Sequence, residues 1–337
     1  MRRGNEVRVV AVALAAALGS FGAANGQANM RPPQFHHLHL NSVDPQAALA
    51  FYTAQFSTTS KASWAGFPAL NSPNDVMVLF TKVAAPPTIV PQSAYWHFGW
   101  HVPDVHKSLA TYQNRPDVQL LPLYTTEEGG FVFVSSDTWP GTGGVLGLTT
   151  AQIAAAKAEG VKPAGGAGFA YMQGPDNAII EYQGNMPAER FNHVHLYQED
   201  PFCAQLWYQK HLGGTPVASR VPGAPVRTEA NCKVARSPDR TWPALEKRGM
   251  FRVPTAAVTF GDVALTWYAN PGDTPLAPSR GQLYDHIALG VSDLDAWVKK
   301  LRDEGVTFLE APYKIGDTRA AMIEGPSREA IELVEVK

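Results

Sequence analysis

Apolar residues occur along this chain in short runs, which alternate with amphipathic stretches and with Pro- or Gly-rich connectors. The run at 35–40, Phe-His-His-Leu-His-Leu, predicts a strand, and Asp44-Pro45 then opens a helix whose apolar face comes from residues 47–56. Residues 75–82 predict a further strand, and a Pro-rich connector follows at 84–92. The pattern therefore predicts a β-α-β-β unit at the start of the folded part.

This unit recurs along the chain. Residues 191–196, Phe-Asn-His-Val-His-Leu, repeat the first run 156 positions later (191 − 35), and Asp200-Pro201 again opens a helix. Further units begin with strands at 95–102 and 284–291, and an aspartate that caps a helix follows each strand. Repeats of this size indicate an internal duplication, which sets the fold before any local pattern does. Two similar halves are therefore expected, joined by a linker at 184–190.

The second unit is longer than the others. An excess at about residues 125–167 holds a strand-like stretch at 129–135 and an Ala-rich helix at 149–159. Inserts of that length are usually lids or other functional excursions from a core, so this one could cover a site. We expect a first domain at 30–187, which carries the insert, and a second domain at 190–337.

Composition and the N-terminal residues indicate an exported, two-core protein. The chain has 337 residues and 45% hydrophobic content, which is ample for two cores. Residues 1–28 show the Arg-containing start, the apolar run and the small-residue end of a secretory signal peptide, with cleavage after Ala28 or Ala24. The apolar run at 9–18 is shorter than the roughly 20 residues that span a membrane. We therefore expect a periplasmic or secreted protein with no membrane contact after cleavage.

Charge and cysteine content narrow the function further. Without the leader, 25 Lys and Arg stand against 29 Asp and Glu (28 − 3 and 30 − 1), which excludes a strongly basic nucleic-acid-binding domain. Cys203 and Cys232 are the two cysteines, and an oxidising compartment favours a disulfide between them. Two unrelated buried thiols are the alternative, since the sequence does not show whether their Cα atoms come within about 7 Å.

Two histidines and one glutamate recur at equivalent strand positions in each half. In the first half they are His37, His97 and Glu181, and in the second they are His193, His286 and Glu332. Each glutamate stands in an Ile-containing strand after a Gly-Pro turn, where a carboxylate is costly to bury unless it is paired or bound to metal. A 2-His-1-carboxylate set leaves coordination positions open and suits Fe(II) or Mn(II), with Zn(II) or Ni(II) as alternatives.

The repeated β-α-β-β-β plan, the strand histidines and the Gly-Pro…Ile-Glu endings resemble the vicinal oxygen chelate superfamily, which includes glyoxalases, bleomycin resistance proteins, fosfomycin resistance enzymes and extradiol dioxygenases. The resemblance covers nearly the whole mature chain. It implies an α+β fold of four tandem βαβββ modules in two paired-module domains. In that family two modules form a cup around one metal ion. The resemblance therefore implies one site of His37, His97 and Glu181, and another of His193, His286 and Glu332.

Departures from the family patterns bear on the reaction. The closing strands of the first and third units, at 76–80 and 263–267, lack the glutamate that glyoxalases usually have there, which moves the chain towards the three-ligand, fosfomycin-type and extradiol-type members. An exported, doubled chain does not fit the fosfomycin type. Tyr171, ten residues before Glu181, resembles the tyrosine that hydrogen-bonds the substrate oxygen in extradiol enzymes. Their catalytic histidine has no counterpart, because Lys162 stands nineteen residues before Glu181.

Further histidines share the strand faces of the candidate ligands. His39 and His195 lie two residues beyond the first-strand ligands, so they are alternative ligands or acid–base groups, and His101 shares a face with His97. Tyr171, His39 and His101 are the catalytic candidates.

We expect an exported divalent-metal-dependent enzyme, dioxygenase-like or glyoxalase/lyase-like, acting on a small oxygen-chelating substrate. The alternative is a non-catalytic small-molecule-binding protein, as in the bleomycin resistance members. A monomer and a homodimer both stay open, and the sequence identifies neither the substrate nor the reaction.

Overall fold

The computed structural model describes residues 30–112, 115–126, 130–138, 150–163, 165–219, 222–235 and 252–337. The expected signal peptide lies outside these residues. Residues 31–337 form one compact unit. In the described ranges no helix is long and apolar enough to cross a membrane.

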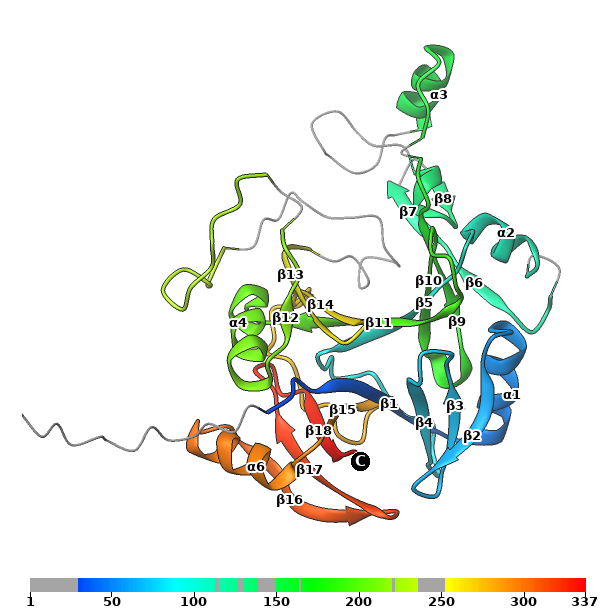
Figure 1. Cartoon of the computed structure of the whole chain (residues 1–337). Coiled ribbons are helices and arrows are strands. Elements are labelled where there is room, and N and C mark those ends of the chain that lie inside the picture. The colour runs from blue at the N-terminus through cyan, green and yellow to red at the C-terminus, as the bar shows by residue number, and fades with distance from the viewer. Residues whose placement is uncertain are drawn as a thin grey trace, which may run out of the picture. The chain divides into compact units, whose positions relative to one another are not determined.

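Four βαβββ modules follow one another along the chain (Figure 1). The first comprises β1 (Gln34–Ser42), α1 (Pro45–Gln55), β2 (Ser60–Trp64), β3 (Phe67–Asn71) and β4 (Met77–Lys82). The second comprises β5 (Tyr95–His101), α2 (Val105–Ala110), β6 (Gln119–Leu121), β9 (Phe169–Gln173) and β10 (Ile179–Gln183). The third comprises β11 (Arg190–Gln198), α4 (Pro201–Leu212), β12 (Thr215–Pro216), β13 (Arg252–Phe260) and β14 (Val263–Ala269). The fourth comprises β15 (Tyr284–Val291), α6 (Leu294–Asp303), β16 (Phe308–Ile315), β17 (Thr318–Glu324) and β18 (Ala330–Glu335).

The predicted insert lies between β6 and β9. Its described elements are β7 (Leu123–Thr126), β8 (Gly130–Val132), a 3-10 helix (Ser135–Asp137) and α3 (Thr150–Ala158). Strands β7 and β8 pair as an antiparallel hairpin. The 3-10 helix is tied to β9, because the Phe169 amide donates a hydrogen bond of 2.8 Å to Ser135 Oγ. A second 3-10 helix (Pro175–Asn177) forms the Gly-Pro turn that leads into β10.

The modules pair into two eight-stranded sheets. The outer-module sheet, from modules one and four, has the order β16-β17-β18-β15-β1-β4-β3-β2. The inner-module sheet, from modules two and three, has the order β12-β13-β14-β11-β5-β10-β9-β6. In each sheet the first strands of the two modules pair antiparallel, β1 with β15 and β11 with β5.

The α+β class and the presence of four modules that pair two by two confirm the predicted fold class. The expected pairing of module one with two, and of module three with four, is wrong, and the sheets do not follow the division at 184–190. The physical reason is that the first strands of the modules have similar apolar patterns, so each offers the others an equally suitable edge.

Helix caps and aromatic packing hold the modules in place. Asp44, Asp104 and Asp293 cap α1, α2 and α6 by accepting hydrogen bonds from backbone amides in the first turn, as their positions predict. Helices α1, α4 and α6 pack against β3, β13 and β17. Phe35 of β1 stacks on Phe191 of β11 at 5.6 Å between ring centroids, which joins the two sheets.

Candidate metal centres

Strand register in the inner-module sheet brings a histidine, a glutamate and a tyrosine into one row. His193 of β11 lies opposite Gly99 of β5, Gly99 lies beside Glu181 of β10, and Glu181 lies opposite Tyr171 of β9. Adjacent strands are about 4.8 Å apart, so His193 and Glu181 flank a strand position that has no side chain. Their side chains therefore meet over Gly99.

Glu181 is the centre of a cluster with His97, His193 and His195, which we call the inner cup. Its Oε2 lies 2.8 Å from Nε2 of His97, 3.6 Å from Nε2 of His193 and 3.5 Å from Nδ1 of His195. His97, which lies opposite His195, donates a hydrogen bond to this carboxylate oxygen. Glu181, His97 and His193 are buried and His195 nearly so. Four potential metal ligands therefore converge from β5, β10 and β11.

The missing side chain at Gly99 leaves room for the position that the imidazole of His193 takes. A Cβ atom at Gly99 would lie 1.9 Å from Cε1 and 2.1 Å from Nε2 of His193. Real carbon atoms pack at about 3.5–4.0 Å, so an alanine there and the observed imidazole position exclude each other. The glycine gives His193 its place beside Glu181.

The outer-module sheet repeats the plan. His37 of β1 lies opposite Ala288 of β15, which lies beside Glu332 of β18, and His39 lies opposite His286. Oε2 of Glu332 lies 3.4 Å from Nε2 of His37 and 3.8 Å from Nε2 of His286. His37, His39 and His286 form a second group of potential ligands, and all three are buried. Glu332 adds the carboxylate of this outer cup.

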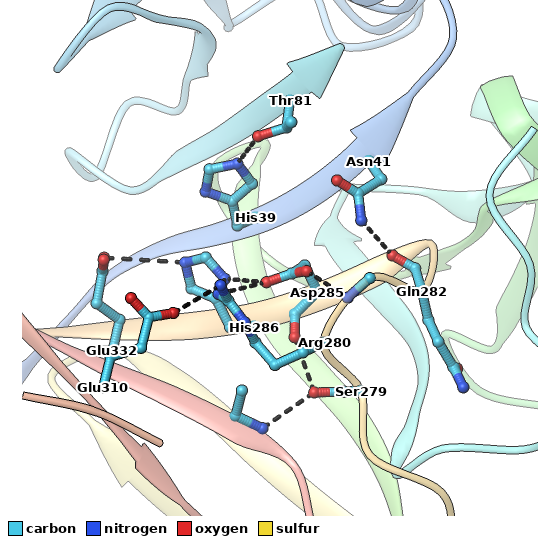
Figure 2. Close-up of polar contacts among 12 residues, drawn as sticks. His39, Asn41, Thr81, Ser279, Arg280, Gln282, Asp285, His286, Glu310 and Glu332 are labelled. Carbon is cyan, nitrogen blue, oxygen red and sulfur yellow. Dashed lines mark hydrogen bonds and ion pairs between the residues drawn. The ribbon is translucent and has the colours of Figure 1, made fainter. Parts of the chain in front are cut away.

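A hydrogen-bond network orients His286 in the outer cup (Figure 2). Nδ1 of His286 lies 2.6 Å from Oδ1 of Asp285, which also accepts a hydrogen bond of 2.8 Å from Nη1 of Arg280. The amide of Gly281 donates to the other oxygen of Asp285 at 2.7 Å. Burial alone would raise the pKa of Asp285, but the hydrogen bond from His286 and the charges of His286 and Arg280 hold it well below its usual range. The carboxylate therefore accepts from Nδ1–H, and Nε2 of His286 faces Glu332.

The side chains of His39 and Glu332 in the outer cup also have hydrogen-bond partners. Nε2 of His39 lies 2.7 Å from Oγ1 of Thr81 (Figure 2), and Tyr313 donates a hydrogen bond to Oε1 of Glu332. The inner cup has no equivalent of Asp285, because Trp96 precedes His97 and Nδ1 of His97 has no hydrogen-bond partner among the described residues.

A β-bulge shapes each first strand beside its cup. The register of β1 shifts between Phe35 and His37, and that of β11 shifts between Phe191 and His193. Bulges re-aim side chains and are frequent next to functional sites. Their presence at the same place in both copies explains why His37 and His193 occupy equivalent positions in the two cups.

Several buried nitrogen and oxygen atoms that could bind a metal ion have no hydrogen-bond partner in the described part of the chain. They include His37 Nε2, His286 Nε2 and Glu332 Oε2 in the outer cup, and His193 Nε2 and His195 Nδ1 in the inner cup. An unsatisfied buried polar group costs about 1–3 kcal/mol, more if it is charged. A divalent cation would coordinate these lone pairs together, so the donor atoms of both cups fit a metal ion.

Protonation states in the inner cup suit metal binding. Burial lowers the pKa of His97 to about 4, and burial with the charges of His193 and His97 lowers the pKa of His195 well below its usual value. Burial alone would raise the pKa of Glu181, but His193, His97 and His195 together hold it well below its usual range. At neutral pH the imidazoles of His97 and His195 are neutral and the carboxylate is ionised, which are the forms that bind metal.

The outer cup differs in its carboxylate. Burial, with the charges of neighbouring groups, lowers the pKa values of His37 and His39 well below the usual histidine value. In contrast, burial raises the pKa of Glu332. The inner cup thus holds the more firmly ionised carboxylate, Glu181. The outer cup holds the histidine whose orientation is fixed by a carboxylate, since His286 is hydrogen-bonded to Asp285.

The expected ligand sets are therefore rearranged. His37 does not join His97 and Glu181, as expected, but lies with His286 and Glu332. His193 takes the place beside His97 and Glu181. The two first-strand histidines have exchanged cups because the modules pair one with four and two with three.

The structure separates the three catalytic candidates. Tyr171 lies against His97, with 5.1 Å between ring centroids, and burial together with Glu181 raises its pKa well above the usual value. His39 lies in the outer cup. His101 lies on the same face of β5 as His97 but about 13 Å further along the strand, which is four residues at about 3.3 Å each. Nε2 of His101 lies 3.2 Å from Oε1 of Gln183.

Gly99, Asp285 and Tyr313 are site residues that the sequence patterns did not indicate. The one available signal was Gly99, a residue without a side chain inside an aromatic strand, Tyr-Trp-His-Phe-Gly-Trp-His. Its meaning depends on the strand that lies beside it, which the sequence does not give.

Comparisons with known proteins agree with this architecture. The family model for the Glyoxalase/Bleomycin resistance protein/Dioxygenase superfamily matches residues 190–333. A point mutant of glyoxalase I from Zea mays has a similar structure, with 16% identity, 92% of this chain and 94% of that chain covered, and a TM-score of 0.58. A putative dioxygenase from Bacillus subtilis has 11% identity, 90% and 86% coverage and a TM-score of 0.51. At these identities the similarity shows the fold alone. No curated protein matches the sequence.

Proposed function

Since the chain contains a domain of the glyoxalase/bleomycin resistance protein/dioxygenase superfamily and has the fold of solved proteins of that group, we propose that it is an exported, divalent-metal-dependent enzyme acting on a small oxygen-chelating substrate. The observation that carries the proposal is the convergence of histidines and a glutamate in each cup, with buried ligand atoms that lack hydrogen-bond partners among the described residues. Both ligand sets come from one chain, so a second copy is not needed to complete either cup.

In the inner cup, Glu181, His97 and His193 would hold the ion, with His195 as a further ligand or a proton-transfer group. A divalent ion bound there supplies a Lewis acid, or, as Fe(II), a centre for dioxygen activation. Tyr171 remains protonated, so it can donate a hydrogen bond to a substrate oxygen. Burial of the cup excludes bulk water and strengthens each of these interactions.

The closing strands favour a three-ligand, dioxygenase-like site over a glyoxalase-like one. In parallel register, β4 places Leu79 beside His39, and β14 places Thr266 beside His195. Neither position offers the acid that glyoxalases usually have in these strands. An open coordination position is therefore left for substrate or oxygen, as in 2-His-1-carboxylate Fe(II) sites, which favours Fe(II) or Mn(II) over Zn(II) or Ni(II).

Export is supported by the leader pattern at 1–28 and by the disulfide between Cys203 and Cys232. Disulfides persist in oxidising compartments and are rare in the cytosol. The open choice between paired and separate cysteines is thus resolved as a pair in the structure.

The test is metal content. The mature chain is purified anaerobically and analysed by mass spectrometry together with Glu181→Ala, Glu332→Ala and the exposed-site control Glu229→Ala. We expect iron or manganese in the wild type and the control, and one equivalent fewer in each cup variant. Zinc or nickel would point to isomerase or lyase chemistry. A wild type that takes up no metal after reconstitution would overturn the enzyme proposal and favour a non-catalytic binding protein.

A further inference from the structure

A cavity of about 430 Å³ opens on the inner-module sheet, and none of the proposed metal ligands lines it. Small-molecule sites usually measure roughly 300–1,000 Å³, so the volume suits part of a small ligand. The lining comes from the ends of β5, β9 and β10 and from the insert, and it includes His101, Ser136, Ala167, Phe169, Gln183 and Met186.

The floor of the cavity is the row of side chains next to the metal row. Gln183 of β10 lies beside His101 of β5 and opposite Phe169 of β9. Gly99, Glu181 and Tyr171 occupy the same strands two residues away, and residues two apart share a face. The two rows are therefore about 7 Å apart on one surface.

The insert closes the cavity from the other side. Ser135, Ser136 and Thr138 belong to its 3-10 turn, and residues 165–168 lead back into β9. The Gly165 amide donates to the Ser136 carbonyl oxygen at 2.9 Å, and the Gly184 amide donates to the Gly168 carbonyl oxygen at 3.1 Å. The first bond ties the two wall segments to each other, and the second ties residues 165–168 to the end of β10.

Two polar atoms in the lining are buried without a hydrogen-bond partner in the described structure, Nδ1 of His101 and Oγ of Ser136. Oε1 of Gln183 accepts from Nδ2 of Asn192 at 3.1 Å and lies 3.2 Å from Nε2 of His101. An amide oxygen only accepts, so Nε2 of His101 carries the proton and Nδ1 presents a lone pair. Burial lowers the pKa of His101 to about 4, which keeps the ring neutral.

Each of these two atoms suits a hydroxyl group of a ligand. A hydroxyl can donate to Nδ1 of His101 or accept from Oγ of Ser136. Among the described residues the lining contains no Asp, Glu, Lys or Arg, so these residues offer nothing to pair with a charged ligand. Phe169, Ala167 and Met186 supply apolar surface.

We propose that this cavity binds a neutral, hydroxyl-bearing apolar group of the phenol or alcohol class, and that this group is the distal end of the substrate whose chelating oxygens reach the inner cup. The first part stands on the cavity alone. The second part rests on the proposed function.

The first part is tested with phenol, toluene and benzoate as probes, by calorimetry and ligand-observed NMR on the full mature chain without metal. We expect phenol to bind more tightly than toluene, and benzoate not to bind. Ser136→Ala and His101→Phe should each reduce phenol affinity about five- to tenfold, as the loss of one hydrogen bond predicts, and leave toluene affinity unchanged. Ser63→Ala, on an exposed position of β2, is the matched control. Equal phenol affinity in all variants, binding of benzoate, or no binding of phenol would overturn the proposal.

The second part is tested by adding Mn²⁺ and measuring the relaxation of the phenol protons. We expect enhanced relaxation in the wild type and in Glu332→Ala, and its loss in Glu181→Ala. Phenol binding without this enhancement, in protein shown to carry Mn²⁺ in the inner cup, would refute the link to the metal. Phenol binding in protein that takes up no metal would count against the proposed function and leave the cavity assignment intact.

Discussion

Substituting Gly99 by alanine should remove metal from the inner cup and leave the outer cup unchanged. Gly99 lies between His193 and Glu181 in the strand register, and the imidazole of His193 covers it. The substitution adds one carbon atom, which would lie in direct conflict with His193.

The size of the effect follows from the contact distances. The new Cβ would lie 1.9 Å from Cε1 of His193, and carbon atoms pack at about 3.5 Å or more, so the ring must retreat by about 1.6 Å. Metal–ligand distances tolerate only about 0.2 Å. A displacement several times that tolerance removes His193 as a ligand. We expect an affinity loss beyond the roughly 10–100-fold that follows changes around a ligand, with about 1–3 kcal/mol of stability lost to overpacking.

The assay is a calorimetric titration with Mn²⁺ in a Glu332→Ala background, which leaves only the inner cup to fill. Gly272→Ala is the matched control, because its Cβ would approach no atom closer than 3.5 Å. In the outer cup, Ala288 occupies the position equivalent to Gly99, opposite His37. If Gly99→Ala binds Mn²⁺ as tightly as the control, His193 can adopt another productive position and the reasoning from Gly99 is refuted.

Three further predictions concern single features of the structure. Asp285→Asn should weaken metal binding about 10–100-fold in the outer cup alone, measured in a Glu181→Ala background, because Asp285 fixes the tautomer of His286; unchanged affinity would contradict this role. The folded-state pKa of His97, about 4, is below its ordinary value of 6.5, so the unfolded chain binds more protons between these values and the stability of metal-free protein should fall as pH drops from about 6.5 to 4. Urea midpoints across this range should show a shallower slope for His97→Gln, and an equal slope would exclude the assigned contribution. Replacing Cys203 and Cys232 with alanine should cost about 2–4 kcal/mol of unfolding free energy in urea titrations, because their disulfide closes a sequence separation of 29, and unchanged stability would contradict it.

The sequence was informative wherever a feature recurs in the duplicated units. His37 and His193, and Glu181 and Glu332, stand at equivalent points of the duplicated units, and this recurrence predicted both the modules and the candidate ligands. Aspartate caps before α1, α2 and α6 were recognisable because capping is local. The caps depend only on neighbours close in sequence, and the recurrence is visible without knowing which segments lie together in space.

Module pairing could not be predicted, because it depends on contacts between distant segments. The first strands β1, β5, β11 and β15 are all largely buried, so their apolar patterns do not distinguish one partner from another. The pairing in turn decides which histidine meets which glutamate. The hairpin of β2 and β3 was missed for a different reason: residues 60–64 are mostly exposed or half-buried and carry little apolar signal.

The central claim is that two metal centres are built from modules that are distant in sequence, and paired substitutions test it most directly. Metal stoichiometry is measured in His37→Ala/Glu332→Ala and in His37→Ala/Glu181→Ala. The structure predicts that the first variant loses one equivalent, since both residues serve the outer cup, and that the second loses two. The opposite result, with two equivalents lost from the first variant and one from the second, would contradict the account and restore the pairing of modules that follow each other along the chain.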